Sequence, residues 1–68
     1  MNFELQGREF IELNNLLKVT GMCESGGQAK MVISEGAVQV DGKTEKRKRC
    51  KIYQGQHVVF NGQSVSVL

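Results

Sequence analysis

Two dipeptides in the C-terminal half, Asp41-Gly42 and Asn61-Gly62, constrain the fold of this chain more than any other feature. Both are preferred central residues of two-residue β-hairpin turns, because those positions require a positive φ that asparagine, aspartate and glycine tolerate best. Valines alternate with other residues before the first turn and after the second. The sequence therefore predicts one hairpin from Val38 onward and a second over residues 57–68, with Ile52 and Tyr53 entering the core between them.

A first helix is predicted over residues 12–20. Leu13, Leu16, Leu17 and Thr20 fall at helical spacing on one face, while Asn14 and its polar neighbours point elsewhere. The glycine at position 21 suits a left-handed residue after the helix, because it has no Cβ to clash there. The following methionine, at position 22, would fold back on the last turn.

A second helix is predicted to begin after Ser25. A serine at the N-cap with Gln28 three positions later forms a capping box, in which each side chain accepts a bond from a free backbone N–H. Ala29, Val32 and Ile33 then make the buried stripe, and a glycine at position 36 ends the helix. Alternating apolar residues near the N-terminus predict a short extended segment. The expected fold is α+β, with two adjacent helices packed on a small antiparallel sheet.

Size and residue inventory exclude several classes of function. Sixty-eight residues make one domain, spanning 1–68, with little room for a deep pocket. One histidine and no nucleophile beside a base argue against an enzyme. No cofactor or metal site is expected, because two cysteines without a CxxC pair cannot supply the usual zinc ligands. Neither a signal peptide nor a membrane span is apparent, so a cytoplasmic protein is expected.

The two cysteines, Cys23 and Cys50, have two possible states. Reduced thiols are favoured, since a cytoplasmic compartment keeps them reduced. A bridge between them, or a redox role, is the alternative.

Positive charge is concentrated in one part of the chain. Residues 30–51 hold seven of the nine Lys and Arg residues against three of the seven acidic ones. The densest run is Lys46, Arg47, Lys48 and Arg49, followed by Lys51. If extended, Arg47, Arg49 and Lys51 share one face and the two other lysines share the opposite face. Such a run predicts binding of an anionic partner, although a solvated edge strand would also carry lysines.

A second anion-binding feature is the start of the second helix. Its first N–H groups are free and carry the positive end of the helix dipole, and Gly26 and Gly27 leave that backbone uncovered. Lys30, one turn later, can reach the same anion. A plain linker with a helix cap is the alternative interpretation. The four aromatic residues, Tyr53 among them, are predicted to lie in the core, which favours recognition of RNA shape and phosphate over base stacking.

Three ordered motifs, covering about residues 10–60, resemble the S4 RNA-binding domain. They are Leu13-x-x-Leu16-Leu17-Lys18-x-x-Gly21-Met22, Ser25-Gly26-Gly27-Gln28-Ala29-Lys30 and Glu35-Gly36-x-Val38-x-Val40-Asp41-Gly42. The resemblance implies an αL RNA-binding surface, made of the two helices and the following hairpin, that faces structured RNA such as rRNA or tRNA. The residues it assigns to this surface are Lys18, Ser25, Gly26, Gly27, Gln28, Lys30, Lys43, Lys46, Arg47, Lys48, Arg49 and Lys51.

Two positions depart from the family pattern. Gly26 stands where many S4 domains have an arginine, which removes one expected phosphate contact and shifts the prediction toward the hairpin side. Gly55-Gln56 replaces the usual Gly-Asp near the end of the domain. The expected function is RNA binding by a monomer, in association with ribosomal particles. A protein–protein adaptor and a DNA-binding module are the alternatives.

Overall fold

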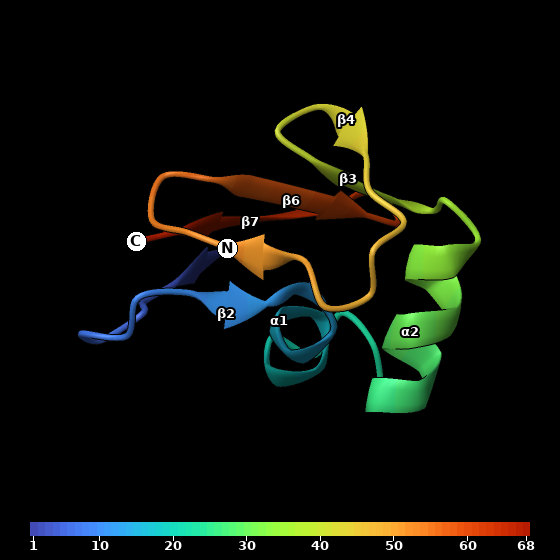
Figure 1. Ribbon diagram of the computed structural model, residues 1–68, viewed down its shortest axis with the longest axis horizontal. Helices are drawn as coiled ribbons and strands as arrows, with labels where there is room; N and C mark the ends of the chain where they lie inside the picture. The colour runs from blue at the N-terminus through green and yellow to red at the C-terminus, as the bar shows by residue number, and fades with distance from the viewer.

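The computed structural model describes residues 1–68, and it places the two helices on one side of a five-stranded sheet (Figure 1). The helices are α1 (Leu13–Val19) and α2 (Gly26–Ser34). The strands are β1 (Asn2–Phe3), β2 (Ile11–Glu12), β3 (Val38–Val40), β4 (Lys43–Thr44), β5 (Lys51–Ile52), β6 (His57–Phe60) and β7 (Gln63–Val67). The predicted α+β class is confirmed. Neither helix is long and apolar enough to cross a membrane.

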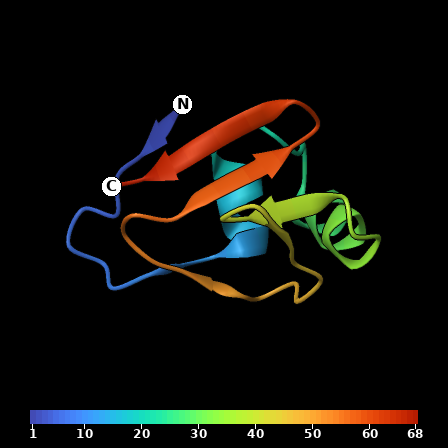
Figure 2. The same ribbon diagram turned by 90° about the horizontal axis from the view of Figure 1, so that it is seen from above.

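Both predicted hairpins form at the expected turns. Asp41-Gly42 joins β3 to β4, and Asn61-Gly62 joins β6 to β7, with all four residues at positive φ. The sheet order is β1-β7-β6-β3-β4, so the short β4 lies at one edge. Figure 2 shows β7, β6 and β3 side by side, with α1 crossing behind them. Alternation along these strands points Val38, Val58 and Val65 into the core.

The sheet is antiparallel, as expected, except at the β1 edge. β1 pairs with β7 in parallel, which makes the sheet mixed. A parallel pair needs a long crossover between its strands, and here nearly the whole chain serves as that crossover. The N-terminal segment also forms more than one ribbon: β2 pairs antiparallel with β5 in a separate two-stranded sheet.

The helices bury the faces that their spacing predicts. Leu13, Leu16 and Leu17 of α1 and Ala29 and Ile33 of α2 are completely buried in one hydrophobic core. Each Å² of apolar surface that the core removes from water stabilises the fold by about 25 cal/mol. Burial in this core is therefore the main force that holds both helices to the sheet. Gly21 is left-handed as expected, Met22 is buried in the same core as Leu17, and the Cys23 N–H donates to the Leu17 carbonyl at 2.9 Å.

One residue of α1 differs from the prediction. Asn14 was expected to point away from the core, yet it is buried. The segment before β5 crosses the start of α1 and covers it, since the Leu13 N–H donates to the Cys50 carbonyl and the Asn14 N–H to the Lys48 carbonyl. The Asn14 Oδ1 atom has no hydrogen-bond partner. This crossing is a long-range contact that helical periodicity cannot reveal.

Candidate nucleic-acid interface

The start of α2 is capped as the sequence predicts, with one shift. The Ser25 Oγ accepts a hydrogen bond from the Gln28 N–H at 3.1 Å. The Gln28 Oε1 accepts from the Glu24 N–H at 2.6 Å, one residue before the expected N–H of Ser25. Both polar side chains are thereby committed to the helix end. The N–H groups of Gly26 and Gly27 have no hydrogen-bond partner in the chain, so they remain available to an anion.

Neither glycine at this helix start is required by the backbone. Both have φ in the ordinary range, and a Cβ built at Gly26 would meet nothing within 4 Å. At Gly27 the nearest atom would be the Ser25 Oγ, at 3.9 Å, which is ordinary contact. Alanine would favour the helix by up to about 1 kcal/mol per position. The fold therefore does not require these glycines, and they leave the backbone of the helix start uncovered.

Two lysines of the predicted surface lie on the helices. Lys18, in the last turn of α1, and Lys30, in α2, are both exposed. Lys18 also complements the negative end of the α1 dipole. Neither lysine has an ion-pair partner, so both can contact an anion.

The run from Lys46 to Arg49 is not the extended strand that alternation would require. β4 ends at Thr44, and the chain then forms a loop with a turn at Lys48 and Arg49 before β5. Arg47, Arg49 and Lys51 do not share a strand face, but all three line one surface hollow. Two carboxylates and one aromatic ring fix their positions.

The first of these carboxylates belongs to Glu45. Its two oxygens accept from Nε and Nη2 of Arg47 at 2.9 and 3.0 Å, and Oε2 also accepts from the Arg47 N–H at 2.9 Å. These bonds lower the pKa of Glu45 from 4.5 to about 2 and raise the pKa of Arg47. The Arg47 side chain is still 78% exposed. It is therefore oriented by Glu45 while its Nη1 group remains available.

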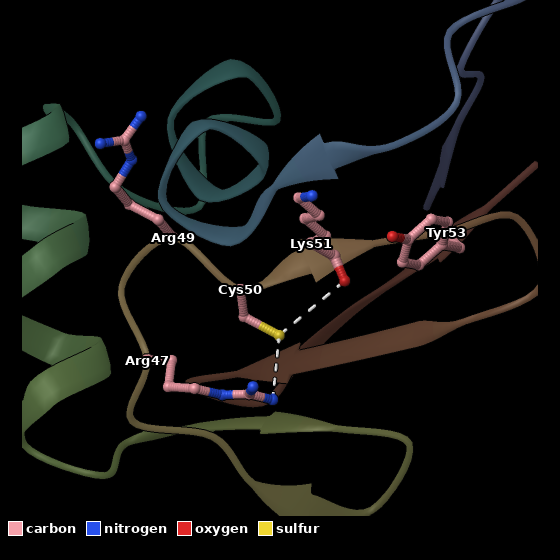
Figure 3. A pocket seen from close by; sticks show the side chains of 5 residues that line it. All are labelled: Arg47, Arg49, Cys50, Lys51 and Tyr53. Atoms are coloured by element: carbon pink, nitrogen blue, oxygen red, sulfur yellow. Dashed lines mark hydrogen bonds between the residues drawn. The ribbon is translucent and has the colours of Figure 1, made fainter.

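The second carboxylate belongs to Glu12. Arg49 Nη2 lies 3.2 Å from Glu12 Oε2, and Arg49 Nε donates to both oxygens. The Lys51 ammonium stands 4.9 Å from the centroid of Phe10. Figure 3 shows Arg49 projecting toward the helices and Arg47 toward the sheet, on opposite sides of the loop.

The Lys46 side chain lies at the C-terminal end of α2. A Cβ at Gly36 would stand 3.2 Å from Lys46 Cε and 4.0 Å from Nζ, so the lysine side chain lies across the glycine that ends the helix. Gly36 has a φ of 80°. A cation here also complements the negative end of the α2 dipole. Lys43 and Lys48 are exposed and have no ion pair.

Two adjoining hollows mark this side of the molecule. The first, of about 570 Å³, is lined by Arg47, Arg49, Cys50, Lys51 and Tyr53 (Figure 3). The second, of about 410 Å³, shares four of these residues and adds Val40, Asp41, Lys43, Glu45 and Gln56. No residue of the α2 start lines either hollow. The structure therefore brings the hairpin-side cations together and leaves the helix start as a separate feature, at the end of α2 away from β3 and β4 (Figure 1).

Tyr53 is a surface residue that the sequence pattern did not predict. Tyr53 is 43% exposed, which contradicts its assignment to the core. Ile52 is completely buried, and because consecutive strand residues face opposite sides, its neighbour must face outward. Phe10 is half-buried and packs against Tyr53 with ring centroids 6.0 Å apart. Phe3 and Phe60 pack against the core, as expected.

Both cysteines are free thiols in the structure. Cys23 is buried and Cys50 half-buried. Burial raises the pKa of Cys23, and burial together with the nearby Glu45 carboxylate raises the pKa of Cys50. The Cys50 Sγ also accepts from Arg47 Nη2 at 3.7 Å. Both thiols are thereby held in the protonated, less reactive form.

Comparison with known proteins gives a consistent picture. The S4 domain model matches residues 3–68, a wider span than the motifs cover. Over 66 residues, the chain is 54% identical to the Escherichia coli (strain K12) protein named "Putative RNA-binding protein YbcJ", with 97% of this chain and 94% of that protein matched. It is 37% identical over 54 residues to the Bacillus subtilis (strain 168) "Probable ribosome maturation protein RlbA", with 79% and 76% matched.

Solved structures agree with the fold. The solution structure of YbcJ from E. coli, described as revealing an αL motif involved in RNA binding, has a TM-score of 0.77 and 54% identity to this chain. That match covers 98% of this chain and 85% of the other. The 30S ribosomal protein S4e of Thermoplasma acidophilum has a TM-score of 0.63 at 23% identity, covering 84% of this chain and 30% of that one. This second likeness concerns the fold alone.

Proposed function

This chain belongs to the S4 domain family, and from that premise we propose that it binds structured RNA, of the rRNA or tRNA kind, through its αL surface. The observation that carries the proposal is the group of cations around the two adjoining hollows, where Lys43, Arg47, Arg49 and Lys51 surround an open surface. Cations gathered on one open surface can neutralise the phosphates of a folded RNA.

The helix start adds a second contact of a different kind. The free N–H groups of Gly26 and Gly27 suit a phosphate oxygen, and Lys18 and Lys30 supply charge on the helices. Ser25 and Gln28 contribute by holding the helix end in place, since their side chains are already bonded to backbone N–H groups. These groups bind and orient a polyanion, so we also propose that the chain acts by binding rather than by catalysis.

A titration against salt tests the RNA proposal. If about five phosphates are neutralised, a plot of log affinity against log salt concentration should have a slope near −3.5 to −4.5. The measurement uses a folded tRNA or rRNA hairpin at several salt concentrations between about 0.05 and 0.3 M. The absence of binding, or a slope near zero, would contradict it.

The same titration separates the alternatives. Duplex DNA of equal length, bound as well as the RNA, would identify a DNA-binding module. Capture of a protein from lysate that survives nuclease treatment, together with weak RNA binding, would identify an adaptor.

We further propose that the RNA belongs to ribosomal particles. The support comes from the relative named as a ribosome maturation protein, which shares 37% identity over 79% of this chain. Co-sedimentation with ribosomal particles in a density gradient, abolished by mild nuclease digestion, is the expected result. Sedimentation only with free protein fractions would contradict it. The monomeric state and the cytoplasmic location stay predictions.

A further inference from the structure

The larger hollow combines cations with an exposed aromatic ring. Its lining residues are Arg47, Arg49, Cys50, Lys51 and Tyr53, and its volume of about 570 Å³ lies in the range of small-ligand sites. Tyr53 is the only tyrosine, and the chain has no tryptophan. A phosphate-binding surface alone needs no aromatic residue, so the ring requires a separate explanation.

Tyr53 directly follows β5 and is held in place by Gln56 and Phe10. The Tyr53 N–H donates to Gln56 Oε1 at 2.7 Å, and Gln56 Nε2 donates to Asp41 Oδ2 at 3.1 Å. One amide side chain therefore ties Tyr53 to the β3–β4 turn, which explains the glutamine at position 56. Phe10 supports the ring at a centroid distance of 6.0 Å. A ring that is fixed before binding loses little conformational entropy when a ligand stacks on it.

Arg47 and Arg49 both line the hollow, and their side chains project from the loop in different directions. In Figure 3, Arg47 projects toward the sheet and Arg49 toward the helices, and Tyr53 lies beyond Lys51 with its hydroxyl turned toward it. Carboxylates hold both guanidinium groups, and the two arginine side chains are still 78% and 76% exposed. A nucleotide within a chain has a phosphate on each side of its base. The hollow therefore offers one ring for a base and two cations for the phosphates of the same nucleotide.

We propose that this hollow binds one unpaired nucleotide of the RNA, with its base stacked on Tyr53 and its flanking phosphates contacted by Arg47 and Arg49. A paired base within a helix is already stacked on both faces, so only a bulged, looped or terminal nucleotide can reach the ring. This inference rests on the proposed RNA binding, and it names the feature of the RNA that the hairpin side selects.

Two RNA hairpins with the same stem, one fully paired and one with a single bulged nucleotide, test the inference. The bulged RNA should bind roughly tenfold more tightly, the effect expected of one base stacked on an aromatic ring. Because Tyr53 is the single tyrosine and no tryptophan is present, intrinsic fluorescence reports on this ring alone. Its emission should be quenched by the bulged RNA more than by the paired RNA at equal occupancy.

Substitutions at position 53 separate stacking from packing. Tyr53→Phe should keep the preference for the bulged RNA, since the ring remains. Tyr53→Leu keeps apolar bulk against Phe10 and should lose the preference, so that the bulged and the paired RNA bind equally well. Gln56→Ala frees the backbone of Tyr53 and should reduce the preference in part.

The outcomes distinguish this inference from the function on which it rests. Equal affinity of the wild-type protein for both RNAs, or a full preference retained by Tyr53→Leu, would overturn the nucleotide site and leave RNA binding intact. If neither RNA binds, the proposed function fails, and the nucleotide site fails with it.

Discussion

The start of α2 and the loop between β4 and β5 are both proposed to bind anions, but they present different groups for it. At the helix start the donors are main-chain N–H groups, positioned by the helix itself, and the polar side chains are committed to the cap. In the loop the donors are long side chains. Two of them, Arg47 and Arg49, are positioned by the carboxylates of Glu45 and Glu12.

Because of this difference, the number of cations in the loop overstates its positive potential. Each ion pair offsets part of the positive potential of its arginine, although it also fixes the guanidinium in one orientation. Lys43 and Lys48 are unpaired and keep their full charge, but their long side chains are not fixed by an ion pair. The helix start contributes little net charge and costs little entropy when it binds. The two regions should therefore respond differently to salt and to substitution.

Removing the loop charges should have the largest effect. The variant with Lys46, Arg47, Lys48 and Arg49 all replaced by glutamine should lower the magnitude of the salt slope by about 2 to 3. Because each unit of slope is a factor of ten between 0.1 and 1 M salt, affinity at 0.1 M salt should fall on the order of a hundredfold. The change should be similar for unrelated RNA sequences, as measured by fluorescence anisotropy.

Circular dichroism should show that this variant remains folded, since the bonds that attach the loop to α1 are main-chain bonds. Two variants that each remove one positive charge, one inside and one outside the predicted surface, make the test sharper. Lys48→Gln should reduce the slope by about 0.7 to 0.9, whereas Arg8→Gln, outside the predicted surface, should leave it unchanged. Equal effects of the two would mean that total charge, and not the loop, determines affinity.

The helix start should show the opposite combination of effects. The double variant Gly26→Ala/Gly27→Ala should weaken RNA binding about tenfold. Its two methyl groups would keep a phosphate from approaching the backbone N–H groups closely enough to accept their hydrogen bonds. The slope should change little, since no formal charge is lost. Thermal stability should rise, by up to about 1 kcal/mol at each site, because alanine favours a helix where neither backbone nor space requires glycine.

Gly36→Ala is the control for this pair. Its positive φ, and the Lys46 Cε that would lie 3.2 Å from the new Cβ, should lower stability by about 1 to 2 kcal/mol. If the Gly26 and Gly27 substitutions also destabilised the protein, their effect on RNA binding would have a structural cause.

Releasing Arg47 from its carboxylate should have a smaller effect. Glu45→Gln removes a negative charge beside the hollow, so affinity for RNA at 0.1 M salt should rise severalfold and the slope should steepen by less than about 1. Glu9→Gln removes an equal charge from an exposed position without an ion pair and serves as the control. A loss of affinity in Glu45→Gln alone would show that orientation of Arg47 outweighs its charge.

The same ion pair predicts a small dependence of stability on pH. The pKa of Glu45 in the folded protein, about 2, is lower than its ordinary value of 4.5, so the folded state binds fewer protons than the unfolded state. This contribution is complete above pH 4.5 and is lost as the pH falls to about 2. Thermal melts from pH 6 to 2 should show a weaker acid dependence in Glu45→Gln, and a carboxyl titration by NMR should place Glu45 near pH 2. A normal titration would contradict the ion pair.

Local patterns predicted much of this fold because local physics determines it. The Asp41-Gly42 and Asn61-Gly62 turns, the stripes of α1 and α2, and the Ser25 cap each depend on neighbours a few residues away. The family resemblance, confirmed over residues 3–68, rests on the same motifs.

Apart from the one-residue shift in the Ser25 cap, the features that local patterns did not reveal involve pairing between distant segments. The parallel β1–β7 pair, the burial of Asn14 under the loop, and the ion pair between Arg49 and Glu12 join residues far apart in the chain. Tyr53 belongs with them, because pairing of β5 with β2 decides which of two adjacent apolar residues faces out.

The sequence by itself thus determined which anion-binding groups exist: a capped helix start with uncovered glycines and a dense run of cations. Only the tertiary structure decided how those groups are presented. Packing of the loop on α1 makes the run a loop rather than an edge strand and brings Arg47 and Arg49 to the first hollow. Both arginines are paired with carboxylates there, and one tyrosine faces outward beside them. The number of charges follows from composition, whereas their positions depend on contacts between residues far apart in the chain, which local sequence patterns do not reveal.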